Sequence, residues 1–418
     1  MNIETKLQVE NLSVESLAPD PANPRQIDLS EMEALTRSIQ QFGFIQPVVA
    51  RRDGLAVIGG HQRLVAARRL GMKTVPVVLL DIGPERARVL GLALNRVGGT
   101  WDEELLARLL KDLRTTPDVD VSLSGFTEDE VKDLLKTLDV RERRERPETF
   151  DFAQAMEEAR REPKTAPGDI WSLGDHRLMC GDATDAAAVD RLLGGTKTQM
   201  AFTDPPYNVD YGHHGNLKWK ARGKKIQNDA LTPEAWEAFC SSWASNLLGS
   251  VEGAVYVCMS GQEWPTVTRV LAGKGGHWST TLIWSKDRFT LGRADYQRQY
   301  EPLWYGWRVG AKHVWNGGRD QGDIWRITRP HDSPLHPTMK PLELVERAIG
   351  NSSERGDKVL DLFLGSGSTL IACERTGRIC YGMEIDRHYC DVVIARFESF
   401  SGEKATKLAI DERHEETA

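Results

Sequence analysis

A strand, a glycine turn and a helix follow one another between Val359 and Arg375, and this pattern constrains the fold more than any other part of the chain. Residues 359–364 are apolar apart from Asp361, glycines stand at 365 and 367, and an apolar helix is predicted over residues 370–375. A second strand is predicted over residues 379–385 and carries Glu384. This acid stands about 20 residues after the glycine turn, where a βαβ unit places the acid that binds a ribose. The sequence therefore predicts an α/β fold whose glycine turn receives a ribose-containing cofactor.

The glycine turn has the chemistry of a ligand site. Glycine lets the backbone approach a bound molecule closely, and the N-terminus of the following helix offers N–H groups that have no partner within the helix. A single Gly-x-Gly is weak evidence by itself, so a second signature is needed to indicate the reaction.

The second signature is Asp204-Pro205-Pro206-Tyr207, which follows the apolar run at residues 200–202 and is predicted to lie at the end of a buried strand. Proline has no N–H group and a fixed φ, so the carbonyls of this turn are left to accept hydrogen bonds from a ligand. The Asp204 carboxylate adds a charged acceptor, and Tyr207 offers a ring on which an extruded base can stack. Such a pocket suits a flat ring with an exocyclic amine, although an Asp-Pro turn after a strand is also a common structural feature.

These motifs resemble those of the DNA amino methyltransferases that use S-adenosylmethionine. Asp204 to Tyr207 is similar to their catalytic motif, and Asp361-x-Phe363-x-Gly365-x-Gly367 to their cofactor loop. Two further segments match: His336-Pro337-Thr338-Met339-Lys340-Pro341 resembles the segment that closes over the methionine end of the cofactor, and Gly181-Asp182 precedes the catalytic strand. The order of the motifs resembles the β group of these enzymes, and the resemblance covers roughly residues 168–400.

The resemblance implies a Rossmann-like methyltransferase fold, with S-adenosylmethionine as cofactor and no metal. It implies a role for Glu384 at the cofactor ribose, for Asp361 and the turn from Gly365 to Gly367 at its methionine half, and for Asp182 at its adenine. The implied catalytic residues are Asp204, Pro205, Pro206 and Tyr207. The implied cofactor-binding residues are Asp361, Phe363, Gly365, Gly367, Thr369, Glu384, Asp182, Thr338 and Lys340.

Three alternatives compete with methylation of adenine N6 in DNA. Aspartate at the head of the catalytic motif resembles adenine-specific members, whereas serine is commoner in those that methylate cytosine N4. An RNA or protein amine methyltransferase would more usually carry asparagine there. The third alternative belongs to another class, a ParB-like DNA-binding or partition protein, against which the intact Asp204, Gly365 and Glu384 argue.

Residues 9–95 resemble the N-terminal domain of ParB-type partition proteins and their sulfiredoxin-like relatives. The matching pieces are Asn23-Pro24-Arg25, the segment at residues 43–49, and Gly59-Gly60-His61-Gln62-Arg63 between a predicted strand and helix. Family members often carry Glu-Arg after the second glycine, where this chain has His61-Gln62, so nucleotide binding by this domain stays open. A small α/β ParB-like domain is therefore expected in front of the methyltransferase domain.

The expected organisation is a ParB-like domain at residues 1–95, a helical segment and charged linker at 96–166, a methyltransferase domain at 167–400 and a polar tail at 401–418. Two amphipathic helices are predicted over residues 101–113 and 127–138. The first has a leucine stripe on one face, formed by Leu105, Leu106, Leu109, Leu110 and Leu113. The charged, proline-terminated segment at residues 141–147 is the predicted linker.

The net charge of −7 places a constraint on binding of double-stranded DNA, the expected partner. Phosphate contacts need local lysine and arginine, and the candidate is a basic run shortly after the catalytic motif. Its residues are Lys218, Lys220, Arg222, Lys224 and Lys225. The arginine-rich stretch at residues 287–329 is a candidate target-recognition insert.

Cysteine usage and apolar runs indicate the compartment. The six cysteines are scattered without a Cys-x-x-Cys pair, which predicts reduced core residues. No apolar run approaches the length of a membrane helix, and residues 1–6 lack the apolar core of a signal peptide. A cytoplasmic protein without membrane contact is expected, and whether it forms a homodimer is left open.

Overall fold

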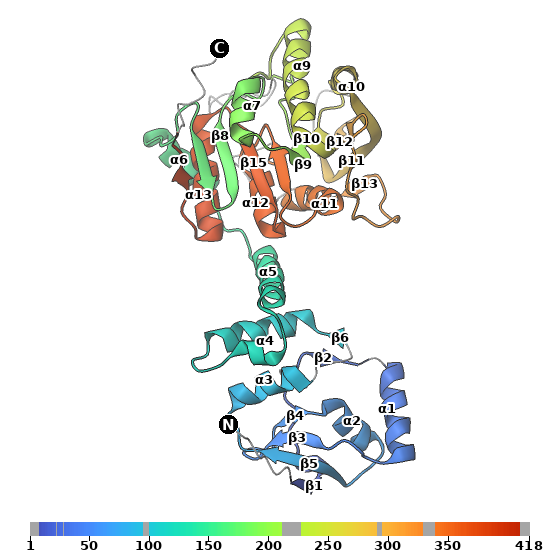
Figure 1. Cartoon of the computed structure of the whole chain (residues 1–418). Coiled ribbons are helices and arrows are strands. Elements are labelled where there is room, and N and C mark those ends of the chain that lie inside the picture. Colours follow the sequence, from blue (N-terminus) through green and yellow to red (C-terminus); the bar gives the residue numbers. More distant parts are fainter. Residues whose placement is uncertain are drawn as a thin grey trace. The chain divides into compact units, whose positions relative to one another are not determined.

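The computed structural model of the chain describes residues 8–21, 23–27, 29–94, 100–210, 227–290, 295–328 and 339–409 (Figure 1). The packing of the backbone divides the chain into two units, Met1–Glu142 and Arg143–Ala418. The division falls near residue 142, whereas the sequence led us to expect the methyltransferase domain to begin at residue 167.

The first unit contains a four-stranded mixed sheet in the order β1, β5, β3, β4. Strand β5 pairs antiparallel with β1 and parallel with β3, and β3 pairs antiparallel with β4. The strands are β1 (Val9–Ser13), β3 (Val48–Arg51), β4 (Val57–Gly59) and β5 (Thr74–Leu80). Helices α1 (Leu29–Phe42) and α2 (His61–Arg69) complete the predicted α/β unit.

The remainder of the first unit is mainly helical. A short ribbon pairs β2 (Arg25–Gln26) with β6 (Thr100–Trp101). The helices are α3 (Pro84–Leu94), α4 (Glu103–Thr115) and α5 (Glu128–Glu145), with short 3-10 turns at Val14–Ser16 and Val121–Ser124. Four leucines of the predicted stripe on α4 are buried, but Leu105 is 40% exposed because it lies at the edge of that stripe.

The charged linker predicted at residues 141–147 is mostly helical, because α5 continues to Glu145. Two of its arginines bond within the second unit: Arg143 lies 2.5 Å from Glu374, and Arg146 donates to the carbonyl of Phe400. These two residues are therefore part of the packed structure of the second unit.

The second unit is built on a ten-stranded sheet in the order β13, β11, β12, β10, β9, β14, β15, β8, β7, β16. The five central strands from β10 to β8 run parallel, and β12 and β7 join them antiparallel. The central strands are β8 (His176–Cys180), β9 (Thr198–Thr203), β10 (Val251–Cys258), β14 (Lys358–Asp361) and β15 (Ile379–Glu384). The outer strands are β7 (Ile170–Leu173), β11 (Gly276–Thr290), β12 (Arg298–Arg308), β13 (Ile324–Arg326) and β16 (Thr406–Lys407).

Helices cover both faces of this sheet, as a doubly wound fold requires. Alternate residues of a strand point to opposite faces, so Met200 and Phe202 of β9 join one apolar cluster and Ala201 joins the other. One cluster is completed by α11 (Leu342–Ser352), α12 (Ser368–Thr376) and α13 (Arg387–Ser401), and the other by α7 (Ala186–Leu193), α9 (Pro233–Ser250) and α10 (Trp264–Gly273). Helix α6 (Phe152–Arg161) packs on α13. The predicted Rossmann-like fold with a small α/β domain in front is confirmed.

The sheet has a topological switch point between β14 and β9. From β14 the chain crosses to β15 on one side, and from β9 it crosses to β10 on the other. Doubly wound proteins bind ligands outside the carboxyl ends of the strands at such a point. Here those strand ends are Thr203 and Asp361, where the catalytic and cofactor motifs begin.

Strands in the outer parts of the sheet continue beyond the apolar core. Strands β11 and β12 pair antiparallel over a long stretch that runs from buried apolar positions into polar residues. Part of the predicted polar tail forms β16, which pairs with β7 at the sheet edge.

The six cysteines are all buried and have free thiols, and their predicted place in the core is confirmed. Within the ranges given above, no helix combines the length and the apolar character needed to cross a bilayer.

Candidate active site

The predicted catalytic and cofactor motifs lie side by side at the switch point. The Thr203 hydroxyl donates a hydrogen bond of 2.9 Å to Asp361, so the last residues of β9 and β14 are tied together. Asp204 follows directly after this bond. The fold therefore places a carboxylate from the first motif next to the turn of the second.

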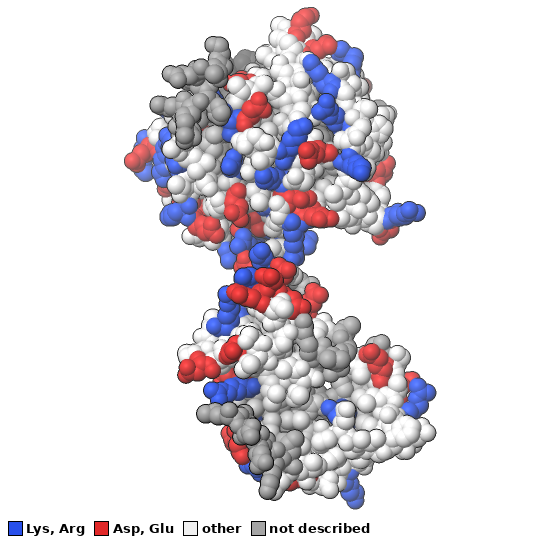
Figure 2. All heavy atoms as spheres, in the orientation of Figure 1, with Lys and Arg blue, Asp and Glu red and all other residues white. Residues whose placement is uncertain are grey.

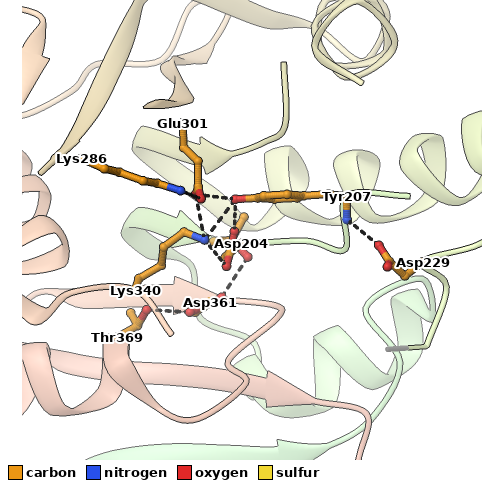
Figure 3. A network of polar contacts seen from close by, with 9 residues as sticks. Asp204, Tyr207, Asp229, Lys286, Glu301, Lys340, Asp361 and Thr369 are labelled. Carbon is orange, nitrogen blue, oxygen red and sulfur yellow. Dashed lines mark hydrogen bonds and ion pairs between the residues drawn. The ribbon is translucent and has the colours of Figure 1, made fainter. Parts of the chain in front are cut away.

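Asp204 lies at the centre of a polar network (Figure 3). Its Oδ2 accepts a hydrogen bond of 2.6 Å from the Lys340 ammonium, and its Oδ1 accepts one of 2.7 Å from the Tyr207 hydroxyl. Lys340 also donates to the Tyr207 hydroxyl at 3.0 Å and lies 5.2 Å from the centre of the Tyr207 ring. Lys340, expected at the cofactor, thus lies among the residues of the catalytic motif.

The backbone after Tyr207 is fixed by Asp229. One carboxylate oxygen of Asp229, whose side chain is buried, accepts from the N–H groups of Tyr207 and Val209, each at 3.2 Å. Between them, Asn208 adopts a left-handed conformation with φ of 52°, and its side chain bonds the backbone of Leu231. This clamp holds the Tyr207 ring in one position relative to the strand end.

Sequence reasoning missed Asp229 and two further residues of this network, Lys286 on β11 and Glu301 on β12. Glu301 Oε2 lies 3.1 Å from the Tyr207 hydroxyl and 3.2 Å from the Lys340 ammonium, and Glu301 Oε1 accepts from Lys286 at 2.5 Å. A usable signal existed for Glu301, which directly precedes the buried run at residues 302–306, because charges next to the core are usually paired.

The centre of the network holds the carboxylates of Asp204 and Glu301 and the ammonium groups of Lys286 and Lys340. Burial raises the pKa of Asp204, an effect that the Lys340 charge only partly offsets. Although burial alone would raise the pKa of Glu301, the charges of Lys340 and Lys286 lower it to about 2. The carboxylates in turn raise the pKa of Lys340 despite its burial. Glu301 is therefore firmly ionised, and Asp204 is the carboxyl group of the pair that protonates more readily.

Asp361 anchors the cofactor turn. Its Oδ1 accepts from Thr203 and from the Phe363 N–H at 3.0 Å, and its Oδ2 accepts from the Thr369 hydroxyl at 2.6 Å. Burial raises the pKa of Asp361 to about 6. Asp361 and Thr369 thus bond each other and shape the turn, while the Phe363 ring packs against Trp243 in the core.

The turn itself has the conformation expected of a ligand cradle. Gly365 and Gly367 have φ values of 54° and 87°, which side chains disfavour, and a Cβ on Gly367 would lie 3.1 Å from Val393. The Gly365 N–H donates to Glu384 Oε2 at 2.8 Å. Ser368, the first residue of α12, has a buried hydroxyl with no hydrogen-bond partner among the described residues. Sequence reasoning named Thr369 here and missed Ser368.

A hollow of about 260 Å³ lies at the carboxyl ends of β8 and β15. Gly181, Asp182 and Ile385 are among its lining residues, and Ile385 follows Glu384 directly. Asp182 uses one oxygen to accept from the N–H and hydroxyl of Thr184, at 2.9 and 2.8 Å. The structure therefore brings Asp182 and Glu384, predicted at the adenine and the ribose, to one edge of the sheet.

Arg396 on α13 supports the cofactor turn from behind. Its side chain is 1% exposed, its Nη1 donates to the carbonyl of Ser366 at 2.8 Å, and its Nε and Nη2 bond the two carboxylate oxygens of Glu148 at 2.5 and 2.9 Å. Glu148 precedes α6 and directly follows the predicted linker at residues 141–147, before the expected start of the methyltransferase domain at residue 167. Glu148, which lies outside the expected methyltransferase domain, thus fixes the Arg396 guanidinium that bonds the cofactor turn.

Several predicted site residues lie outside the described part of the chain. They are Thr338 and the basic run Lys218, Lys220, Arg222, Lys224 and Lys225. On the face shown in Figure 2, the described basic and acidic side chains are interspersed. The DNA-binding assignment of the basic run remains a prediction.

A doubly wound sheet whose glycine turn lies beside a carboxylate at a neighbouring strand end has the fold of the Rossmann-like methyltransferases. Comparison with protein families matches a DNA methylase model at residues 198–396, a ParB N-terminal domain at 2–96 and a ParB-methyltransferase HTH domain at 104–167. The chain belongs to the N6/N4 DNA methylase family and carries a ParB N-terminal domain. The HTH domain is one that sequence reasoning did not identify, although it predicted helices there.

Several known proteins are similar to this chain. The chain is 35% identical over 241 residues to the type II methyltransferase M2.DpnII of Streptococcus pneumoniae, which covers 48% of this chain and 82% of the relative. It is 23% identical over 265 residues to the DNA adenine methyltransferase YhdJ of Escherichia coli, covering 54% and 84%. The crystal structure of M1.HpyAVI with SAM is 21% identical, covers 52% of this chain and 98% of its own, and has a TM-score of 0.40.

The cofactor of the family is S-adenosylmethionine, and the residues present fit it. The buried Ser368 hydroxyl, which has no partner among the described residues, and the helix N-terminus offer donors at the turn, and the half-buried Glu384 offers an acceptor beside the hollow. We expect Ser368 and the turn to hold the methionine half, and Glu384 to hold the ribose.

Replacement of Glu384 by alanine should raise the dissociation constant of S-adenosylmethionine by about tenfold or more, because a charge-assisted hydrogen bond is worth about 1.5 to 3 kcal/mol. Burial raises the pKa of Glu384 to about 7, so the wild-type affinity should weaken as the pH falls below this value and the carboxylate is protonated. Calorimetric titration from pH 6 to pH 8 measures both effects. The Glu384→Gln variant serves as control, and persistence of the pH dependence in that variant would contradict the assignment.

Proposed function

We propose that this protein methylates the N6 amine of adenine at specific sites in double-stranded DNA. The observation that carries the proposal is the Asp204 carboxylate at the end of β9, tied through Thr203 to the cofactor turn. A group that binds an amine and a turn that binds a methyl donor meet at one edge of the sheet.

The amine of a nucleobase is a poor nucleophile because its lone pair is delocalised into the ring. Hydrogen bonds from its two hydrogens to Asp204 and to the carbonyl of Pro205 would localise that lone pair on nitrogen. Tyr207 would support the ring of the base, in the position that the Asp229 clamp gives it. Preorganised acceptors of this kind act through electrostatics and orientation.

S-adenosylmethionine supplies an electrophilic methyl group when it is bound. Because the reacting nitrogen lies inside the base stack of duplex DNA, the target base must leave the stack to reach Asp204. Asp204 is partly exposed, at 21% of its side chain, which leaves it accessible from the carboxyl edge of the sheet.

Two observations favour adenine over cytosine. Aspartate heads the catalytic motif, and one relative bears the name DNA adenine methyltransferase. Cytosine N4 is the alternative, since it presents a similar aromatic amine to the same acceptors. A role as a partition protein alone is less well supported, because the complete network around Asp204 has no use in a protein that only binds DNA.

The product decides between these substrates. DNA is incubated with purified protein and S-adenosylmethionine, and its nucleosides are analysed by mass spectrometry. We expect N6-methyladenine, and none when the protein carries Asp204→Ala. N4-methylcytosine as the only product would overturn the adenine assignment and leave the amine chemistry standing.

A further inference from the structure

We propose that Glu301, held by Lys286, is a positioning residue that offers Lys340 a second carboxylate and so frees Asp204 to bind the target amine. The inference rests on the proposed function, because it concerns the same methyl transfer. It assigns a role to two residues of the β11–β12 hairpin that neither motif contains.

Both oxygens of Asp204 are occupied in the structure. The Tyr207 hydroxyl bonds Oδ1 at 2.7 Å, and the Lys340 ammonium bonds Oδ2 at 2.6 Å. An incoming amine competes with these donors for the same carboxylate. Both contacts are charge-assisted because the acceptor is a carboxylate, and the shorter one also has a charged donor. Release of Lys340 is therefore the step that allows Asp204 Oδ2 to accept a hydrogen bond from the target amine.

Lys340 cannot be released into solvent at low cost, because its side chain is only 7% exposed. An ammonium group buried without a partner is strongly unfavourable. Glu301 Oε2 already lies 3.2 Å from the Lys340 ammonium, and the ammonium lies between this oxygen and Asp204 Oδ2 (Figure 3). A small shift of Lys340 toward Glu301 keeps the charge paired while Asp204 changes partner.

Lys286 makes this second position available. It bonds the other oxygen of Glu301 at 2.5 Å and lies 4.9 Å from the ring centre of Trp284. Strand pairing fixes the geometry, since Trp284 is opposite Glu301 in the β11–β12 register. Against the effect of burial, the charges of Lys340 and then Lys286 lower the pKa of Glu301 to about 2, so the carboxylate is ionised near neutral pH.

The charged and titratable groups that face Asp204 come from several elements. They are Tyr207 after β9, Cys258 at the end of β10, Glu301 on β12, Lys340 before α11 and Asp361 at the end of β14, with Lys286 on β11 acting through Glu301. Among these, Glu301 contributes a negative charge that raises the pKa of Asp204. Its removal should lower that pKa.

The test is Glu301→Gln in the full chain, assayed by single-turnover methylation of duplex DNA across pH. We expect the rate at neutral pH to fall by about tenfold to a hundredfold, as displaced reacting groups do. We also expect the acid limb of the pH profile to move to lower pH, because Asp204 loses a neighbouring negative charge. An unchanged rate, or a slower rate whose acid limb does not move, would overturn the proposal.

Controls separate this result from loss of fold or of function. Glu252→Gln removes an exposed glutamate from β10 and should leave rate and profile unchanged. Lys286→Met should slow the reaction less than Glu301→Gln, and the double variant should be no slower than Glu301→Gln alone, because Lys286 acts through Glu301. If the losses of rate in the two single variants add in the double variant, Lys286 does not act through Glu301. If Glu301→Gln fails to fold, an unchanged rate in Lys286→Met overturns the proposal. If the wild-type protein methylates no DNA, the proposed function itself has failed.

Discussion

Replacement of Asp204 by alanine is expected to slow methylation of DNA by about a thousandfold or more, as the loss of a preorganised electrostatic contact to the reacting group does. Affinity for S-adenosylmethionine should be nearly unchanged, because no contact joins the Asp204 side chain to Glu384 or to the glycine turn among the described residues. Lys340 keeps Glu301 as its partner in this variant, so its buried charge remains compensated. Single-turnover rates and calorimetric titration of the cofactor measure the two effects.

The isosteric Asp204→Asn variant is the matched control. It keeps an acceptor oxygen for one hydrogen of the amine but removes the charge, so we expect a rate between those of the wild type and the alanine variant. A loss of cofactor affinity as large as the loss of rate, in a folded Asp204→Ala protein, would show that this carboxylate does not act at the amine alone.

Replacement of Glu148 by alanine should destabilise the second unit by about 3 kcal/mol or more, because it leaves a buried charge without its partner. Arg396 is 1% exposed and has Glu148 as its bidentate carboxylate. For a unit of this size the melting temperature should fall by about 6 to 12 °C. Cofactor affinity should fall as well, because Arg396 also holds the Ser366 carbonyl in the turn. Thermal melting with and without S-adenosylmethionine measures both.

Glu157→Ala tests whether this effect is specific. Glu157 is an exposed glutamate on the neighbouring helix α6, so its removal should change stability by less than about 0.5 kcal/mol. Equal melting temperatures for Glu148→Ala and the wild type would show that the ion pair contributes little. A chain that begins at residue 163 lacks Glu148 and should show the same loss of stability and cofactor affinity. A chain that begins at Arg143 keeps Glu148 and should not show this loss.

The sequence predicted those parts of the site that are local in the chain. The strand before Asp204, the glycine turn after Asp361 and the strand that carries Glu384 each follow from residues within a few positions of one another. Their meeting at one edge followed from the rule that parallel strands bring their carboxyl ends together. The fold class was predictable for the same reason.

Contacts between distant residues were not predictable in this way. Lys340 is 136 positions from Asp204, and its segment was assigned to the cofactor by resemblance, while its side chain contacts the catalytic motif. Glu301 reaches the site because β12 pairs antiparallel with β10, a register that no local pattern specifies. Glu148 directly follows a charged segment whose composition is typical of a solvated linker, and only the packing of α13 shows that its partner is Arg396.

The burial of all six native thiols has a practical consequence for spectroscopy. Thiol-reactive dyes and spin labels need an accessible thiolate, which buried cysteines do not provide. A single cysteine introduced on the surface would therefore carry the label without removal of the native ones. Two such cysteines, one on β11 and one on α9, would allow the distance between these elements to be measured as DNA and cofactor are added.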